Sequence, residues 1–179
     1  MLELIIKTIW LLLPAYIPNN FAVIFGGGKP LDLGKHFIDG KRILGDGKTI
    51  RGFVAGVLGG IFTAHIQLII EKSFSLSVYS SLDYASFLQL VFLLSFGAML
   101  GDSIGSFIKR RFGVERGGKF PILDQLTFLI IAYILASRCS AFYKLFTLDV
   151  IITGIVITPL LHLTINVLAY KLGLKDVWW

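Results

Sequence analysis

Polar side chains that suit phosphate chemistry gather between residues 101 and 124, a segment that opens with Gly101-Asp102 and closes with Asp124. Between the two acids the polar residues recur at helical spacing, as Asp102, Ser106, Lys109 and Arg110. If a helix continues past Gly101, spacings of three and four residues place them on one face. Such a face suits a polyphosphate with Mg²⁺, because carboxylates are hard oxygen ligands and cations neutralise the phosphate oxygens that the metal leaves bare.

The two acids of this segment are the candidate metal ligands. Asp124 lies just inside an apolar stretch, where an ionised carboxylate is costly unless it faces a polar cavity and finds a partner. A metal ion shared with Asp102 would be such a partner. The alternative is that the basic residues 109–111 lie at the lipid headgroups and that the acids pair with them. Taken together, the acids and cations favour a site with these catalytic residues: Asp102, Asp124, Lys109 and Arg110.

A second segment, from Gly45 to Gly52, is rich in glycine and holds four candidate nucleotide-binding residues: Asp46, Lys48, Thr49 and Arg51. It lacks the spacing and the preceding strand of a P-loop. Its glycines expose backbone N–H groups and its cations lie where an apolar helix begins, which favours phosphate. A turn whose lysines bind headgroups explains the pattern equally well.

Further polar residues are weaker candidates for the same site. The candidate nucleotide-binding set is completed by Ser106, Lys119 and Asn20. Asn19 and Asn20 follow Pro18, and they predict either a broken helix that lines a polar cavity or a turn at the membrane edge. Metal-ligand spacing is absent among the histidines, which we interpret as structural or interfacial: His36, His65 and His162.

The elements that must position these residues are membrane helices. The chain has 179 residues, of which 55% are hydrophobic, and its mean hydropathy of +0.80 excludes a water-soluble globule. More than half of the charged side chains lie in residues 29–51 and 102–124. The net charge of +6 follows from the orientation rule for cytoplasmic loops, so we expect no nucleic acid partner.

Apolar runs between the charged segments predict an all-α integral membrane protein with a single transmembrane domain over residues 1–179. About five spans are expected, at residues 2–25, 52–70, 84–101, 121–137 and 150–170. The first is interpreted as a span rather than a signal peptide, because Glu3 lies at its start and no small-residue cleavage site follows.

Lys and Arg are concentrated in two loops, 27–51 and 102–119, whereas the alternate connections hold few. The positive-inside rule therefore predicts that both loops are cytoplasmic and form the active site. It places the amino terminus outside and the carboxyl terminus in the cytoplasm. We expect a multi-pass protein of the cell membrane whose last residues, Trp178 and Trp179, anchor it at the interface.

Small residues recur at helical spacing in two spans, at Gly52, Gly56 and Gly60 and at Gly97, Gly101 and Gly105. This spacing lets helix backbones approach closely, so packing is the preferred interpretation. In the second set a ligand could also reach the backbone beside Asp102. These two sets of glycines, here called the glycine stripes, are compatible with a monomer and with a homodimer.

The segment from 101 to 124 resembles the signature of membrane phosphatidate cytidylyltransferases, since Ser106 to Arg110 is followed by a short loop, Pro121 and Asp124. The chain is most similar to the archaeal branch of that superfamily, the CDP-archaeol synthase family. The three motifs of that branch read here as Gly45 to Gly52, Gly101 to Arg110 and Leu123 to Gln125.

This resemblance implies transfer of CMP from CTP to an isoprenoid ether lipid phosphate, which gives CDP-archaeol and pyrophosphate in archaeal phospholipid biosynthesis. It implies a requirement for Mg²⁺, held by Asp102 and Asp124, and leaves a second cation such as K⁺ open. Two groups of residues would then bind the nucleotide: Ser106, Lys109 and Arg110 at the leaving pyrophosphate, and Lys48, Thr49 and Arg51 in the rest of the pocket. The attacking phosphate oxygen is already anionic, so no protein base is needed.

Three other classes of protein compete with this interpretation. A CDP-alcohol phosphotransferase would carry a D-G-x-x-A-R motif, which the sequence lacks. A small transporter or channel would show similar halves, which this chain does not visibly offer. A non-catalytic scaffold packed through its glycines would tolerate substitution of both charged segments.

Overall fold

The computed structural model describes residues 1–115, 118 and 120–171, and regular structure in those residues is helical apart from two isolated β-bridges, Pro30 to Thr49 and His36 to Arg42. The helices, in chain order, are α1 Leu2–Tyr16, α2 Pro18–Phe25, α3 Ile50–Ser73, α4 Tyr84–Arg111, α5 Leu123–Ala136, α6 Ser140–Leu145 and α7 Leu148–Lys171, with one 3₁₀ turn, η1, at Tyr79–Ser81. The predicted all-α class is confirmed.

Three helical segments are long and apolar enough to cross a membrane: Leu2–Phe25, Ile50–Ser73 and Tyr84–Arg111. Two shorter apolar helices follow, over Leu123–Ala136 and Leu148–Thr164. The expectation of a multi-pass membrane protein agrees with these lengths, and the fourth and fifth spans of the prediction correspond to the two shorter helices.

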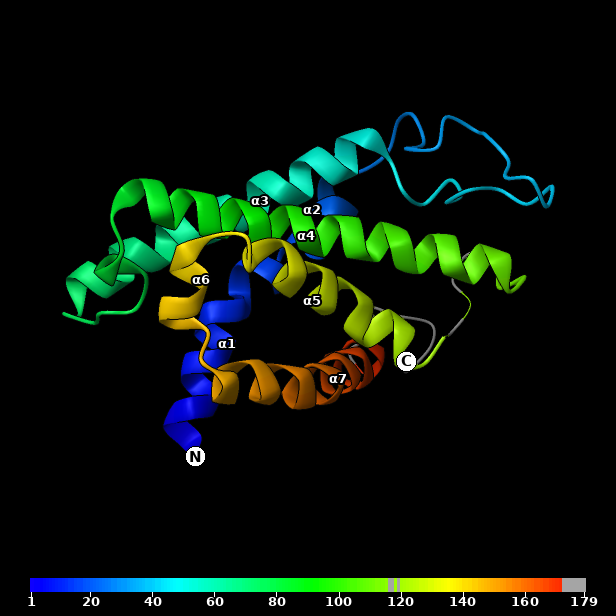
Figure 1. Cartoon of the computed structure of the whole chain (residues 1–179). Coiled ribbons are helices and arrows are strands. Elements are labelled where there is room, and N and C mark those ends of the chain that lie inside the picture. The colour runs from blue at the N-terminus through cyan, green and yellow to red at the C-terminus, as the bar shows by residue number, and fades with distance from the viewer. Residues whose placement is uncertain (116–117, 119, 172–179) are drawn as a thin grey trace.

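The first span is broken where the sequence predicted it. α1 ends at Tyr16, the N–H of Ile17 still bonds to the Leu13 carbonyl, and α2 restarts with Pro18 in its first turn. Proline suits that position because its missing N–H has no helical partner there. The break turns the short helix α2 toward the end of the molecule where the segment 26–49 lies (Figure 1).

α4 extends ten residues beyond the predicted span. Residues 102–111, which the sequence assigned to the loop 102–119, are the last turns of this helix, so the helix continues past Gly101 as the spacing of the polar residues requires. Asp83 caps the helix by accepting a 2.9 Å bond from the Ser86 amide, and three basic residues, 109–111, lie in the last turn. Cations at a helix C-terminus interact favourably with the helix dipole, which stabilises these last turns.

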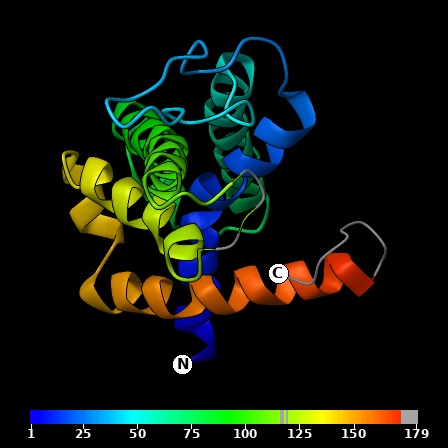
Figure 2. The same cartoon turned by 90° about the vertical axis from the view of Figure 1, so that its right-hand side faces the viewer.

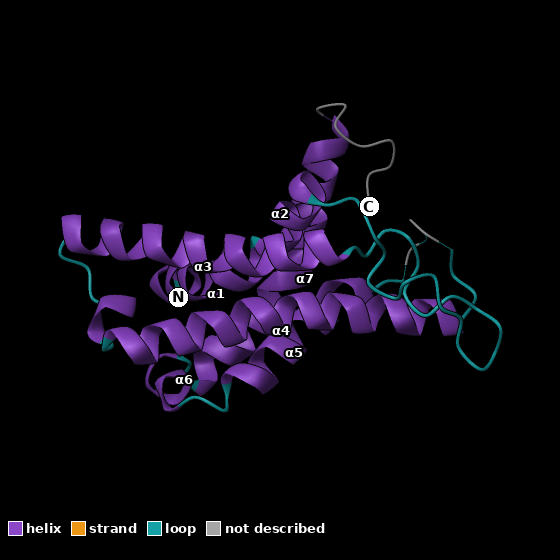
Figure 3. Cartoon of the chain, turned by 90° about the horizontal axis from the view of Figure 1, so that it is seen from above, coloured by secondary structure: helices purple, strands orange, loops and turns teal. Residues whose placement is uncertain are grey.

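α3 and α4 run side by side in opposite directions, and α5 returns along the carboxyl half of α4 (Figure 1). α1 crosses these helices, and α7 packs against α1 and α5 on the outside (Figures 1 and 2). The start of α3, the end of α4 and the start of α5 therefore meet at one end of the molecule. The segment 26–49 lies across that end (Figure 2) and extends beyond the helices (Figure 3).

The glycine stripes lie where these helices touch. A Cβ at Gly101 would come within 2.6 Å of the Phe128 Cα on α5, and one at Gly97 within 2.6 Å of the Ala132 Cα. On α3, a Cβ at Gly60 would come within 2.6 Å of the Pro14 carbonyl oxygen. The packing interpretation is confirmed for Gly60, Gly97 and Gly101, whose Cβ positions would meet other helices of the same chain.

The end opposite the charged segments is held by a buried acid. Glu71, at the end of α3, is fully buried and accepts hydrogen bonds from the Trp10 indole at 2.7 Å and from the amides of Tyr79 and Ser80 at 3.1 and 2.7 Å. A buried carboxylate is tolerated when donors surround it in this way. Glu71 thus joins α1, α3 and η1 at the end far from the candidate site.

Candidate active site

Two adjoining cavities open at the charged end, between the segment 26–49, the last turns of α4 and the start of α5. The smaller has a volume of about 270 Å³ and the larger about 560 Å³. They share a wall of seven residues: Asp46, Gly47, Lys48, Asp102, Lys109, Asp124 and Phe128. Both predicted charged segments contribute to this wall, although they are more than 50 residues apart in sequence.

The last turns of α4 present one polar face to the smaller cavity. Its wall includes four predicted residues in a row along the helix, Asp102, Ser106, Lys109 and Arg110. The glycines of these turns line the same cavity, and at Gly105 an added Cβ would be at least 3.8 Å from its neighbours. The predicted arrangement on one helix face is confirmed, and it exists because α4 continues past Gly101.

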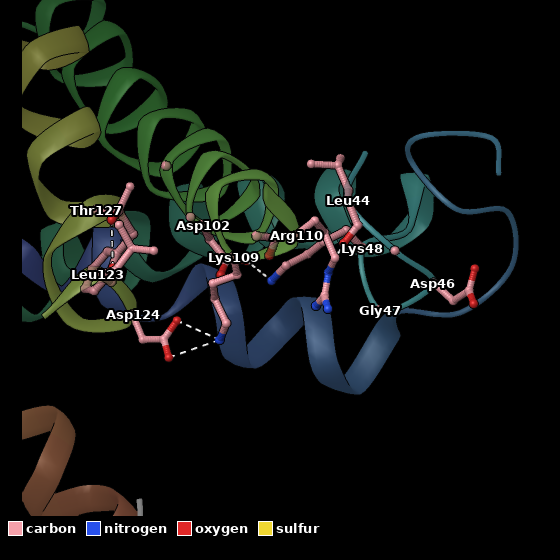
Figure 4. A pocket seen from close by; sticks show the side chains of 15 residues that line it. Leu44, Asp46, Gly47, Lys48, Asp102, Lys109, Arg110, Leu123, Asp124 and Thr127 are labelled. Carbon is pink, nitrogen blue, oxygen red and sulfur yellow. Dashed lines mark hydrogen bonds and ion pairs between the residues drawn. The ribbon is translucent and has the colours of Figure 1, made fainter. Parts of the chain in front are cut away.

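Each candidate metal ligand is paired with a lysine (Figure 4). Lys48 forms an ion pair with Asp102, which joins the 26–49 segment to α4. The Lys109 Nζ donates to both oxygens of Asp124, at 2.9 and 3.1 Å, which joins α4 to α5. The Phe120 amide also donates to Asp124, at 2.9 Å. The side chains of both acids keep between a quarter and a third of their surface exposed, so they remain accessible from the cavities.

The donor set fits Mg²⁺. Among the described residues no three His, Cys, Asp or Glu side chains cluster closely enough to hold a metal alone. Mg²⁺ does not require such a cage, because it keeps several waters and is commonly bound by one or two carboxylates together with substrate phosphates. Two carboxylates on a shared cavity wall meet that requirement, and the lysines balance their charge in the structure as it stands.

Two helix N-termini also point to the cavities. Thr49 caps α3, since its hydroxyl accepts a 3.0 Å bond from the Gly52 amide, and both residues line the larger cavity. α5 begins at Leu123 beside Asp124. The exposed amides and positive dipole of a helix N-terminus favour phosphate groups. The cavities therefore combine cations, helix starts and carboxylates.

Not every predicted residue lies at this wall. The Arg51 side chain donates to the carbonyls of Phe25 and Gly26, at 2.8 and 2.9 Å, and it lines neither cavity. It closes the end of α2, so its predicted nucleotide contact stays a prediction. Asn20 is exposed and lines neither cavity, whereas Asn19 lines the larger one.

Two further predictions concern other parts of the chain. His162, interpreted from sequence as structural or interfacial, lines the larger cavity. Lys119, together with Trp178 and Trp179, lies outside the described residues.

Sequence reasoning missed Asp32 and Arg42. The Arg42 guanidinium bridges Asp32 and Asp46 with contacts of 2.8 Å to each, and Asp32 also accepts bonds from the amides of Leu44 and Gly45. No spacing rule connects these residues with the motifs, because their relation depends on how the 26–49 segment folds back on itself. The sequence signal is only the high density of charge in that segment.

Comparison with known proteins gives a consistent result. The whole chain, residues 1–179, matches the family model described as CarS-like, CDP-archaeol synthase. It is 62% identical over 179 residues to a CDP-archaeol synthase of Archaeoglobus fulgidus, with both chains covered completely. It is 46% identical over 170 residues to one of Methanospirillum hungatei, covering 94% of this chain and 100% of that one.

One solved structure is similar as well. It is described as an intramembrane enzyme for archaeal membrane lipids biosynthesis. The TM-score is 0.74 at 34% sequence identity, and the match covers 91% of this chain and 94% of the other.

Proposed function

The chain belongs to the CDP-archaeol synthase family, and from that premise we propose how its charged end carries out the reaction. The enzyme forms CDP-archaeol by moving CMP from CTP to an isoprenoid ether lipid phosphate. Family and fold favour this activity over a transporter, a channel or a scaffold with basic lipid-binding loops. The observation that carries the proposed site is the shared wall on which three carboxylates and two lysines line both cavities.

We place the phosphates of both substrates at this wall. The face of α4 with Ser106, Lys109 and Arg110 supports the pyrophosphate that leaves CTP. The larger cavity has apolar side chains in its wall, including Val23, Phe53 and Met99, which suit the first part of an isoprenoid chain. The remainder of the lipid would stay in the membrane.

The reaction needs positioning and charge neutralisation rather than a base. An oxygen of the lipid phosphate forms a bond to the α-phosphorus of CTP, and the bond from that phosphorus to the bridging α–β oxygen breaks with its electrons going to pyrophosphate. Since the attacking oxygen is anionic at neutral pH, no proton has to be removed. Lys48 and Lys109 neutralise charge that would otherwise keep the two substrates apart.

Mg²⁺ is the metal that this donor set suits, and Asp102 and Asp124 are its proposed protein ligands. When bound, the ion would withdraw charge from the phosphate oxygens during transfer. The lysines that now pair with the acids would then turn to the substrate phosphates. The proposal requires no second cation, and the assay below includes a test of K⁺.

We further propose that the cavities face the cytoplasm and that α5 and α7 complete five spans in the cell membrane, with the amino terminus outside and the carboxyl terminus inside. The supporting observation is the distribution of charge, because the basic residues concentrate at the end where the cavities open. Basic residues favour the cytoplasmic side of a membrane.

The experiment is a product assay with purified protein in detergent. Labelled CTP and Mg²⁺ are combined with either a geranylgeranyl-ether glycerol phosphate or a diacyl phosphatidate, and the lipid product is identified by mass. We expect a CDP-lipid from the ether lipid that disappears with EDTA, at equal rates in K⁺ and Na⁺ buffers. Product formed equally well in EDTA would overturn the metal site, and absence of product with both lipids would overturn the proposed function.

A further inference from the structure

Asp32 is the most thoroughly bonded acid of the 26–49 segment. It is 7% exposed, and its carboxylate has no accessible surface. Oδ1 accepts from the Gly34 amide at 3.0 Å and from Arg42 Nη2 at 2.8 Å, while Oδ2 accepts from the amides of Leu44 and Gly45 at 2.9 and 3.0 Å. Asp32 lines neither cavity and belongs to none of the three family motifs.

The two amides that donate to Oδ2 belong to Leu44 and Gly45, and the turn formed by these residues lines the smaller cavity. Gly45 has a φ of +95°, a conformation that L side chains rarely adopt and that glycine allows, so the path of this turn depends on the glycine. The Leu44 carbonyl accepts a 3.3 Å bond from Arg110 Nε, which ties the turn to α4. Three residues after Gly45, Lys48 reaches Asp102. The position of both cations thus depends on the turn that Asp32 holds.

Arg42 extends this support to a wall residue. Its guanidinium contacts Asp32 through Nη2 and Asp46 through Nη1, both at 2.8 Å. A planar fork of this kind fixes direction as well as distance, and lysine cannot reproduce it. Asp32 therefore reaches the wall by two routes, one through the backbone of the turn and one through Arg42.

We propose that Asp32 is a positioning residue for CTP binding, which acts through the Leu44–Gly45 amides and Arg42 to hold Lys48 and Arg110 at the phosphates. This inference rests on the proposed function of the same cavities. Asp32 itself touches no substrate. A group that only orients contacts made in both the ground state and the transition state changes KM more than kcat.

The test is steady-state kinetics of Asp32→Asn with CTP as the varied substrate. Asparagine keeps the shape, but its NH₂ group must face either Arg42 or the two amides, where only an acceptor fits. We expect KM for CTP to rise on the order of 10-fold, a change typical of partners that orient contacting groups, with kcat altered less than about threefold. Asp39→Asn is the matched control, because Asp39 lies on the same segment as Asp32 but pairs with Arg111 of α4 and does not touch the turn.

The outcomes separate the inference from the proposed function. A fall in kcat with KM unchanged would mean that Asp32 only maintains the folded fraction, and normal values of both would mean that it has no role; either result overturns the inference. Failure of the wild type to form CDP-lipid would instead overturn the proposed function. Should Asp32→Asn not fold, Arg42→Lys decides, since it keeps the charge but loses the bridge, and an unchanged KM there contradicts the inference.

Discussion

Asp102 and Asp124 each form an ion pair with a lysine in the structure. Replacing one acid therefore removes a proposed metal ligand and also leaves a lysine without its partner. We expect Asp102→Asn and Asp124→Asn each to lower Mg²⁺-dependent CDP-lipid formation at least about 100-fold. Membrane insertion should be unaffected, because the amides keep the size of the acids. Activity is measured by product mass across a Mg²⁺ titration.

Asp149→Asn is the control for these two variants. Asp149 is exposed in the first turn of α7 and lines neither cavity, so its loss should leave turnover unchanged. Near-normal activity in both active-site variants would show that these acids do not bind the metal.

The hydrogen bonds to Asp32 also predict that the stability of the fold depends on pH. Burial by itself raises the pKa of its carboxyl, but hydrogen bonds from Arg42 and from the Gly45, Leu44 and Gly34 amides outweigh burial and hold the pKa well below its ordinary value. A lowered pKa stabilises the fold above the pKa of the unfolded chain, about 3.9, and this stabilisation is lost as the pH falls toward the folded-state value.

The expected result is a difference in thermal unfolding midpoint between the wild type and Asp32→Asn that is constant above about pH 5 and shrinks below about pH 4. Intrinsic fluorescence in detergent measures both midpoints. A difference that widens toward low pH would show that the native contacts do not favour the ionised carboxylate.

At the scale of elements, the site depends on how closely α4 and α5 approach. Gly101→Ala would place a Cβ 2.6 Å from the Phe128 Cα and from the Thr127 carbonyl oxygen, so the two backbones must separate. We expect a loss of about 1–3 kcal/mol of stability, the usual cost of overpacking, and a loss of activity as Asp124 moves away from Lys109. The unfolding midpoint and turnover report these two effects.

Gly105→Ala is a control on the same helix, at a position where an added Cβ fits. Its added Cβ would lie no closer than 3.8 Å to Thr127, and alanine is about 1 kcal/mol better than glycine inside a helix. Its unfolding midpoint should therefore stay level or rise. An equal loss of stability in both variants would show that the helix contact does not cause the effect.

At the scale of the whole molecule, α4 is the helix on which the proposed orientation can be tested. This helix has 28 residues, so it is about 42 Å long and exceeds a hydrocarbon core of about 30 Å. In the proposed orientation its ends lie on opposite sides of the membrane, with the cavities at the basic end. Two exposed residues report the two sides, Ile38 in the 26–49 segment and Ser77 before η1.

Cysteine accessibility tests this orientation in a Cys139→Ala background, since Cys139 is the one cysteine of the chain. In sealed right-side-out vesicles an impermeant maleimide should label Ser77→Cys at once and Ile38→Cys only after permeabilisation. The reverse order would place the active site outside the cell.

Much of this molecule follows from local properties of the sequence. Apolar runs predict helices in a membrane because backbone groups there must be satisfied within the segment, and Pro18 breaks the first run because it lacks an N–H. The face of α4 from Asp102 to Arg110 follows from residue spacing alone. These features depend on neighbours within one or two turns, which the sequence states directly.

Only the tertiary structure decided which distant residues meet. The pairing of Lys48 with Asp102, the closure of α2 by Arg51 and the support of the turn by Asp32 join residues that no periodicity relates. Charge shows that such residues need partners, but it does not select among the partners available. The selection comes from the close packing of α4 on α5 and from the fold of the 26–49 segment, whose energies depend on all the residues in contact at once.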